Sequence, residues 1–190
     1  WDDYVEWSEG PSNRRITQLS LWQLGLSGTL DVSGLSSLQE LDCSENNLSE
    51  LYVSDLSNLI VLYCYDNNIS KLDVSGLSDL QYLDCSENNL SELYVSDLSN
   101  LIVLYCYYNN ISKLDVSGLS KLETLVCSEN NLSELNVSGL SDLEYLACDQ
   151  NNLKELDVRG LSKLETLVCD SNDLSELYVS GLSRLEFLYC

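Results

Sequence analysis

Eight cysteines are the most reactive side chains of this sequence, and their spacing limits the chemistry open to them. They stand 21 residues apart without exception, from Cys43 to Cys190. Zinc sites use closely paired cysteines together with histidine or further cysteines, and this chain has no histidine. Thiols stacked in register one strand spacing apart do not readily meet the geometry of a disulfide. We therefore interpret the cysteines as one buried column of a repeat, and we predict no metal and no cofactor.

Carboxylates are the other abundant reactive groups, but their arrangement does not indicate catalysis. The sequence contains no nucleophile elbow, phosphate-binding loop or metal-ligand cluster, which are the signatures of the common enzyme classes. Asp42 and Asp84 fall two repeats apart on a surface that we expect to be open rather than a cleft. We predict that the protein has no catalytic residues and is not an enzyme. Calcium bound to the acidic surface stays open, although no loop with defined ligand positions is present.

The net charge excludes two classes of partner. The 190 residues include 31 acidic and nine basic side chains, which gives a formal charge of −22. Such a surface repels the phosphates of nucleic acids and of anionic lipids. No apolar run approaches the length of a membrane-spanning helix. We expect neither nucleic-acid binding nor membrane insertion, which leaves cationic proteins, cations and neutral polymers.

A frame of 21 residues positions these side chains. It reads L-x-x-L-x-C-x-x-N-x-L/I-x-x-L-x-V-x-x-L-x-x, and seven full copies and a partial eighth occupy residues 38–190. Residues 16–37 form a degenerate first copy that is one residue longer, with Leu21 in the cysteine column and Leu24 in the asparagine column. A short fixed period with this leucine spacing is typical of a leucine-rich repeat solenoid. We predict an α/β-type repeat solenoid that is mostly strand and coil.

Each copy predicts one short strand and one return segment. Alternation around L-x-C indicates a strand in which Leu62 and Cys64 point inward while Tyr63 and Tyr65 point outward. Stacked strands then form a parallel sheet on the concave face. The asparagine three residues after each cysteine is expected to satisfy backbone groups of adjacent coils. On the return side we expect short extended, turn or 3-10 segments, because the recurrent glycines disfavour a regular helix.

Residues 1–15 lie outside the repeat and predict an N-terminal cap. Trp1, Tyr4 and Val5 have helical spacing. The first coil of a solenoid exposes an apolar end that needs a cover. We expect an amphipathic cap over residues 1–9, and ligand binding by Trp1 and Trp7 is the alternative.

The copies differ mainly at the outward strand positions, where tyrosines gather. Tyrosine combines a large apolar ring with a polar tip and is enriched in binding surfaces. The alternative is that tyrosine simply favours an exposed strand, since Tyr52, Tyr94 and Tyr178 recur on the return side. The predicted ligand-binding face consists of Asp42, Tyr63, Tyr65, Tyr82, Asp84, Tyr105, Tyr107, Tyr108 and Tyr145.

The segments LDCSENNLSEL and KLDVSGLSDL make residues 38–190 resemble bacterial surface or secreted leucine-rich repeat proteins of the LxxLxCxxNxLxxLDVSxLxx type. The resemblance implies a binding or adhesion module for a protein or glycan ligand. It also implies an extracellular or cell-surface location, with a signal peptide removed. It does not identify the ligand, because function lies in a site and not in a fold.

A structural role in assembly is the second hypothesis. Leu185, Leu188 and Cys190 belong to the partial last copy. An open end of a solenoid is a template for further stacking. We therefore expect either further domains after Cys190 or end-to-end self-association.

Overall fold

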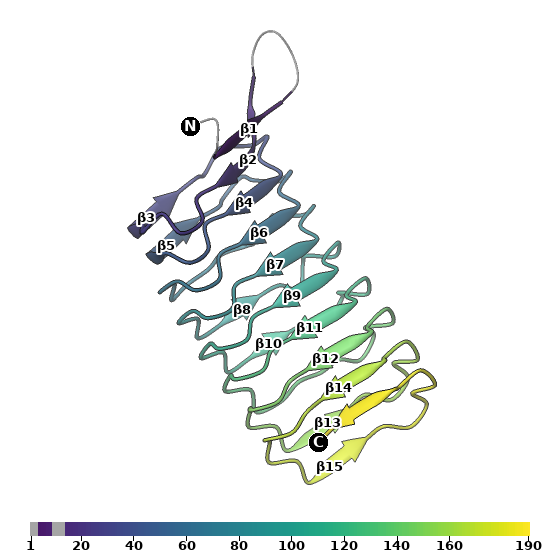
Figure 1. Ribbon diagram of the computed structural model, residues 1–190. Helices are drawn as coiled ribbons and strands as arrows, with labels where there is room; N and C mark the ends of the chain where they lie inside the picture. The colour runs from purple at the N-terminus through teal and green to yellow at the C-terminus, as the bar shows by residue number, and fades with distance from the viewer. Residues whose placement is uncertain (1–3, 9–13) are drawn as a thin grey trace.

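The structure, a computed structural model, describes residues 4–8 and 14–190. It is an elongated stack of coils in which each coil gives one strand to a long main sheet (Figure 1). In sheet order, the strands described there are β1 (Val5–Trp7), β2 (Ile16–Ser20), β4 (Glu40–Asp42), β6 (Val61–Tyr63), β7 (Tyr82–Asp84), β9 (Val103–Tyr105), β11 (Thr124–Val126), β12 (Tyr145–Ala147), β14 (Thr166–Val168) and β16 (Phe187–Tyr189). No helix occurs among the described residues. The predicted repeat solenoid of strand and coil is confirmed.

The return side of the coils carries short two-stranded ladders instead of one continuous sheet. These pair β3 (Ser27–Asp31) with β5 (Asn47–Tyr52), β8 (Leu93–Tyr94) with β10 (Leu114–Asp115), and β13 (Glu155–Asp157) with β15 (Glu176–Tyr178). The ladders are parallel and pair residues of adjacent coils. The return segments of residues 71–73 and 134–136 lie between these ladders and are not strands. The extended and turn-like return side is therefore confirmed, without 3-10 segments in the part described.

The main sheet keeps one register from β4 to β16. Leu41 pairs with Leu62 and Leu62 with Leu83, so each step along the stack advances the sequence by one repeat. The central leucine of each of these strands points into the core, and all of them except Leu188 of the last coil are buried. Because side chains alternate along a strand, the two flanking residues lie on the outer face. The predicted parallel sheet is confirmed.

The cysteine column lies in the core beside these leucines. Every cysteine from Cys43 to Cys169 is at most 1% exposed, and all the cysteines are free thiols. The Cys43 thiol donates a weak hydrogen bond to the carbonyl oxygen of Tyr63 at 3.5 Å, and Cys85 does the same to Tyr105 at 3.6 Å. Cysteine thus acts here as a small apolar residue with a weak donor, as the sequence predicts.

The asparagine column closes the turn that follows each strand. The Asn109 side-chain amide donates hydrogen bonds to the carbonyl oxygens of Cys85, Cys106 and Tyr107 at 3.0, 3.2 and 3.2 Å. Its side-chain oxygen accepts the backbone N–H of Leu90 at 2.9 Å. One buried amide therefore satisfies four backbone groups in two adjacent coils, as predicted.

The same pattern explains the leucine in the first coil. Asn46 serves the coil before it, donating to the Leu21 carbonyl oxygen and accepting the Leu26 N–H, both at 2.9 Å. The first repeat coil has no earlier repeat coil to serve, so its column position can hold Leu24. That side chain is 42% exposed.

The residue before each asparagine adopts a left-handed backbone conformation. Its φ lies between 50° and 53° in the seven coils from Glu45 to Ser171, although none of these residues is glycine. Such a conformation costs a non-glycine residue about 1 kcal/mol or more. The asparagine bonds fix the turn and so offset this strain.

The predicted helical cap is wrong in the part of residues 1–9 that the structure describes. Val5–Trp7 is strand β1, which runs antiparallel to β2 and places Val5 opposite Leu19. The free edge of β2 carries backbone groups that need partners, and a strand supplies them where a helix does not. The helical spacing of Trp1, Tyr4 and Val5 rests on only three residues, and the need to pair the edge of β2 outweighs it. Trp1 lies outside the described residues, and Trp7 is 47% exposed.

At the other end of the stack, β16 pairs with β14. Leu188 and Cys190 are exposed there, and Leu185 is partly buried. Self-association and further domains stay predictions.

Replacing Asn109 with alanine should lower the free energy of unfolding by about 3 kcal/mol or more. The substitution leaves the buried Leu90 N–H without a partner, which costs about 1–3 kcal/mol. It also removes one hydrogen bond from each of three carbonyls that keep another partner, at about 0.5–1.5 kcal/mol each. Urea unfolding followed by circular dichroism measures the change. Asn110→Ala is the matched control, because the neighbouring Asn110 is exposed and its loss should matter little. Equal effects of the two variants would contradict the role given to the column.

The buried thiols should make the protein unstable in alkali. Burial raises the pKa of Cys43 and of Cys127 to about 12, against about 8.5 for a free thiol. The unfolded chain therefore releases these protons first, so stability is full below about pH 8.5 and falls as the pH rises from there towards 12, by up to about 1.4 kcal/mol per pH unit for each thiol. Denaturation at increasing pH measures the slope.

A variant with Cys64, Cys85 and Cys106 replaced by alanine should show a shallower slope, even though it is less stable at neutral pH. All tyrosines are unchanged in this variant, so they cannot cause the difference. An unchanged slope would show that the thiols do not control alkaline stability.

Candidate functional site

Three tyrosines on adjacent strands form a ring cluster on the outer face of the main sheet. Tyr82 on β7 lies 5.0 Å from Tyr63 on β6 and 5.7 Å from Tyr105 on β9, measured between ring centroids, with interplanar angles of 54° and 69°. The strand register places Asp84 directly between Tyr63 and Tyr105, so Tyr82 contacts both of these tyrosines diagonally. Tilted ring pairs of this kind add about 0.5–1.5 kcal/mol each beyond burial. We call Tyr63, Tyr82 and Tyr105 the tyrosine cluster.

Two phenols of the cluster, those of Tyr63 and Tyr82, stay protonated at neutral pH. Partial burial raises the pKa of Tyr63, and the Glu40 carboxylate raises it further. Burial likewise raises the pKa of Tyr82, and the neighbouring Tyr105 raises it further. Each of these two phenols is therefore a neutral group that can donate or accept a hydrogen bond. The rings are held by one another and not by carboxylates, which leaves a preformed, half-exposed aromatic surface.

Asp84 stands within this surface. Burial raises the pKa of its carboxyl group, against the opposing effect of hydrogen bonds from Ser86. The Ser86 N–H and hydroxyl donate to Asp84 Oδ1 at 3.1 and 2.5 Å. Asp42 repeats this arrangement on β4, with Ser44 donating at 3.0 and 2.5 Å. Both carboxylates are thus oriented before any ligand arrives.

The other predicted tyrosines do not join the cluster. Tyr65 and Tyr107 follow the cysteine, where the chain has already left the strand. Ser86 and Glu87 are polar neighbours of the Tyr107 hydroxyl, and the Tyr65 hydroxyl lies 3.5 Å from Glu45 Oε1. Ser44 and Ser86 are fully buried. Ser44 and Ser86 therefore do not lie on the outer face, although each directly follows a cysteine. Their hydroxyls donate to the aspartate that precedes that cysteine.

Tyr108 and Tyr145 are exposed beside the cluster. Tyr108 packs edge-on against Tyr107 at 5.9 Å and is 53% exposed. Tyr145 on β12 pairs with Thr124 of β11, so the whole of β11 separates it from Tyr105. The sequence prediction therefore divides into a contiguous cluster of three rings and a wider set of flanking groups.

The outer face around the cluster carries negative charge only. In each repeat, the strand and its turn run from the residue before the central leucine to the column asparagine. Between residues 40 and 172, these segments contain nine acidic residues and no lysine or arginine. Some of these acids already have partners, since Glu45 accepts hydrogen bonds from Trp22, at 3.1 Å, and from Gln23. The local field favours a cationic group on a partner.

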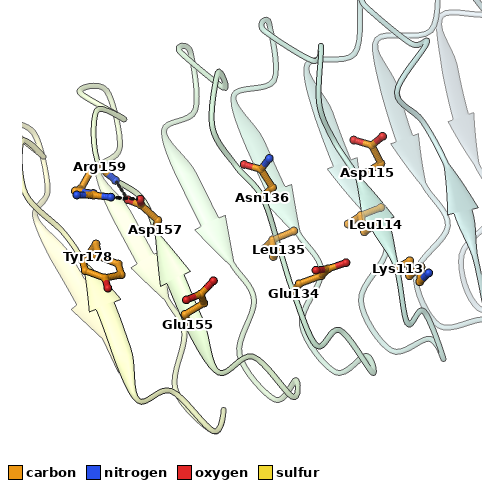
Figure 2. A pocket seen from close by; sticks show the side chains of 10 residues that line it. All are labelled: Lys113, Leu114, Asp115, Glu134, Leu135, Asn136, Glu155, Asp157, Arg159 and Tyr178. Carbon is orange, nitrogen blue, oxygen red and sulfur yellow. Dashed lines mark hydrogen bonds and ion pairs between the residues drawn. The ribbon is translucent and has the colours of Figure 1, made fainter.

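Sequence reasoning missed a second feature, a groove of about 630 Å³ on the return side (Figure 2). It extends over four coils, from Lys113 to Tyr178, and its walls carry both acidic and basic side chains. The sequence signal that could have indicated the groove is the residue after the buried return-side leucine in each coil. Along the chain this column reads Tyr52, Asp73, Tyr94, Asp115, Asn136, Asp157, Tyr178. Three coils in succession lack the tyrosine there.

Neither feature contains a metal-binding group. Across the described ranges, no three histidine, cysteine, aspartate or glutamate side chains are placed to hold a metal ion. Within the same ranges there is also no helix long and apolar enough to span a membrane.

The comparisons with known proteins concern the whole repeat. A two-copy leucine-rich repeat model matches residues 57–100 and 99–142, and a single leucine-rich repeat model matches residues 37–59. Together these matches run from residue 37 to residue 142, which is more than half of the chain. No curated protein sequence matches.

Two solved structures resemble this one in fold and sequence. The functional domain of InlJ from Listeria monocytogenes, described as including a cysteine ladder, has a TM-score of 0.74 and 40% identity over 84% of this chain and 38% of its own. A leucine-rich repeat protein from Leptospira interrogans has a TM-score of 0.73 and 28% identity over 82% of this chain and 44% of its own. The chain thus spans less than half the length of either neighbour.

Replacing Asp84 with asparagine should raise stability at neutral pH. The raised pKa means that the folded protein binds the Asp84 proton more tightly than the unfolded chain does. Ionisation therefore costs stability, and the cost develops as the pH rises above the unfolded value of about 3.9. The gain in the variant should shrink in acid. Urea unfolding at neutral and acidic pH measures both.

Asp73→Asn provides a control of opposite sign. Hydrogen bonds from Ser75 lower the pKa of Asp73, so its ionised form stabilises the fold above the unfolded pKa and loses that effect as the pH falls. This variant should be less stable at neutral pH. A stabilised Asp73 variant, or a destabilised Asp84 variant, would contradict these electrostatics.

Proposed function

The chain belongs to the leucine-rich repeat family, and on that basis we propose that its main sheet face binds a protein partner through the tyrosine cluster. The observation that carries the proposal is the contact of Tyr63, Tyr82 and Tyr105 on an outer face that has acidic but no basic side chains. Leucine-rich repeats commonly mediate protein binding, so the family and the site favour the same class of function.

The rigidity of the cluster suits it to recognition. A tyrosine side chain has few rotatable bonds, so it loses little entropy on binding. The mutual packing of the three rings reduces that loss further. Aromatic residues in the centre of a patch provide most of the binding energy in many protein interfaces. The cluster supplies such a centre.

The acidic surroundings select the chemistry of the partner. Charge complementarity steers association and rejects partners of like charge. The partner should therefore present lysine or arginine side chains next to an apolar contact. Asp84 lies within the cluster and Asp42 beside it, so a basic side chain could meet a carboxylate while its aliphatic stem lies on a ring.

The partial burial of Asp84 is a second support. It raises the pKa of the carboxyl group, so ionisation at neutral pH is expected to cost the fold stability. Natural proteins keep such residues where function requires them. A role in binding would explain why an aspartate stands between two tyrosines.

We also propose that the module is secreted or displayed on a bacterial surface. This location is supported by the likeness of its repeat to bacterial surface leucine-rich repeats. Antibody labelling of intact producing cells, before and after external protease, tests it. Labelling only after lysis would refute it.

Replacing Tyr63, Tyr82 and Tyr105 together with serine should abolish partner binding. The change removes the aromatic centre while the leucine, cysteine and asparagine columns stay intact. An array of purified extracellular and cell-surface proteins, probed with the labelled chain, measures binding. Proteins bound by the original chain should be rich in basic residues, and their affinity should fall as salt is raised.

The matched control replaces Tyr52, Tyr94 and Tyr178 on the return side with serine. It removes the same number of rings from the opposite surface and should keep binding. Equal binding by both variants, with both folded by circular dichroism, would refute the tyrosine cluster as the site.

A further inference from the structure

We infer that the groove on the return side is a second binding site, and that it takes a short neutral oligosaccharide. This site lies on the opposite side of the coils from the tyrosine cluster. It does not depend on the function proposed for the main sheet.

A change in one column of the repeat creates the groove. On the return side, each buried leucine has an outward residue on either side, as in Glu50-Leu51-Tyr52. Where the second of these is tyrosine, its hydroxyl reaches back to the glutamate of the same coil, at 3.3 Å from Tyr52 to Glu50 and 2.9 Å from Tyr94 to Glu92. The ring then lies along the coil surface.

Three consecutive coils lack this ring. Their residues at this position are Asp115, Asn136 and Asp157. The coil before them carries Tyr94 at the same position, and the coil after them carries Tyr178. Leu114 and Leu135 line the floor beneath two of the shorter side chains. Each is 7% exposed, against 3% for Leu51 and 1% for Leu93 beneath tyrosines. Elsewhere between Tyr52 and Tyr178, only a single coil, that of Asp73, lacks the tyrosine. The groove therefore occupies the one long gap in an aromatic column.

The walls of the groove are two rows of polar side chains (Figure 2). Lys113, Glu134 and Glu155 form one row. Asp115, Asn136 and Asp157 form the other. The rows cross successive coils, so the groove runs along the solenoid axis for about three strand spacings, or ~14 Å.

One end of the groove is built more rigidly than the rest. Arg159 donates to both oxygens of Asp157, from Nε at 2.9 Å and from Nη2 at 2.5 Å. Its guanidinium carbon lies 4.8 Å from the centroid of the Tyr178 ring. The Tyr178 hydroxyl in turn donates to Glu176. This stacked set forms one end of the groove.

The mixture of donors and acceptors selects the ligand. Glu134 and Glu155 offer acceptors in adjacent coils, Asn136 offers both a donor and an acceptor, and Lys113 offers donors. Hydroxyl groups of a sugar both donate and accept, so they can meet every one of these groups. The lining carries four carboxylates against Lys113 and Arg159, so anions are disfavoured and a cationic peptide is the competing ligand. The outer face of the main sheet differs in this respect, because it lacks basic residues.

Other ligand classes fit less well. Pockets for drug-like molecules are lined predominantly by hydrophobic and aromatic residues, whereas six of the ten residues that line this groove are charged. A peptide lying along the groove runs perpendicular to the strands, so it cannot extend a ladder through its backbone. An oligosaccharide needs no such pairing.

The test is titration of the labelled chain, followed by nuclear magnetic resonance, with four neutral trisaccharides: maltotriose, cellotriose, mannotriose and triacetylchitotriose. At least one should shift the backbone amides of residues 113–115 and 134–136, with an affinity that does not change with salt. Trilysine, titrated in the same way, represents a cationic peptide.

A groove-filled variant tests the location. Asp115→Tyr with Asn136→Tyr restores the ring that the chain itself carries at Tyr52, Tyr94 and Tyr178, so the variant should fold. Sugar affinity should fall at least about tenfold, or about 1.4 kcal/mol. The serine variant of the tyrosine cluster should keep full sugar affinity, which separates this test from that of the proposed function.

Three results would overturn the inference. One is the absence of shifts at the groove amides with all four sugars. The second is undiminished sugar binding by the folded groove-filled variant. The third is binding of trilysine alone, weakened by salt, which would assign the groove to a cationic peptide.

Discussion

The hydrogen bonds of one buried asparagine per coil are the interaction on which the rest of the structure depends. A solenoid coil must leave its strand sharply, and at that turn several backbone groups would otherwise be buried without partners. Each asparagine side chain satisfies groups in its own coil and in the coil before it, as Asn67 does for Cys43, Cys64 and Leu48. The column therefore links every coil to the previous one as well as closing its turn. The left-handed residue beside it is tolerated for that reason.

This constraint divides each repeat into positions that build the coil and positions that are free to vary. Leucine, cysteine and valine fill an interior in which a larger or polar residue would disturb adjacent coils. The outward positions face no such limit, so exceptions accumulate there. The tyrosine cluster is one group of exceptions on the main sheet. The groove is another, on the return side, where a tyrosine column is interrupted.

Most of the fold could be predicted from the sequence, because periodicity determines it. The strand around Leu62, the burial of Cys64 and the role of Asn67 all follow from spacing and residue type. The cap could not be predicted in the same way. The requirement that shapes Val5–Trp7 is the open edge of β2, a tertiary feature that no local pattern records.

The site was predictable in part for a similar reason. Alternation along a strand placed Tyr63, Tyr82 and Tyr105 on one face. Their ring contacts depend on diagonal neighbours across strands, and only the structure gives those. The sequence pattern predicts a strand that extends one residue too far, beyond the cysteine, and therefore groups Tyr65 and Tyr107 with them. The return groove depends on what three adjacent coils lack, which is harder to recognise in a sequence than what they contain.

Native-state hydrogen exchange tests most directly whether the asparagine column holds the stack together. The amides to follow are those that donate to asparagine side-chain oxygens, at Leu48, Ile69, Leu90, Ile111 and Leu132. If the column carries the fold, these amides exchange as slowly as the strand amides of the main sheet and through the same cooperative opening. Exchange as fast as that of the exposed return-side turns would contradict it.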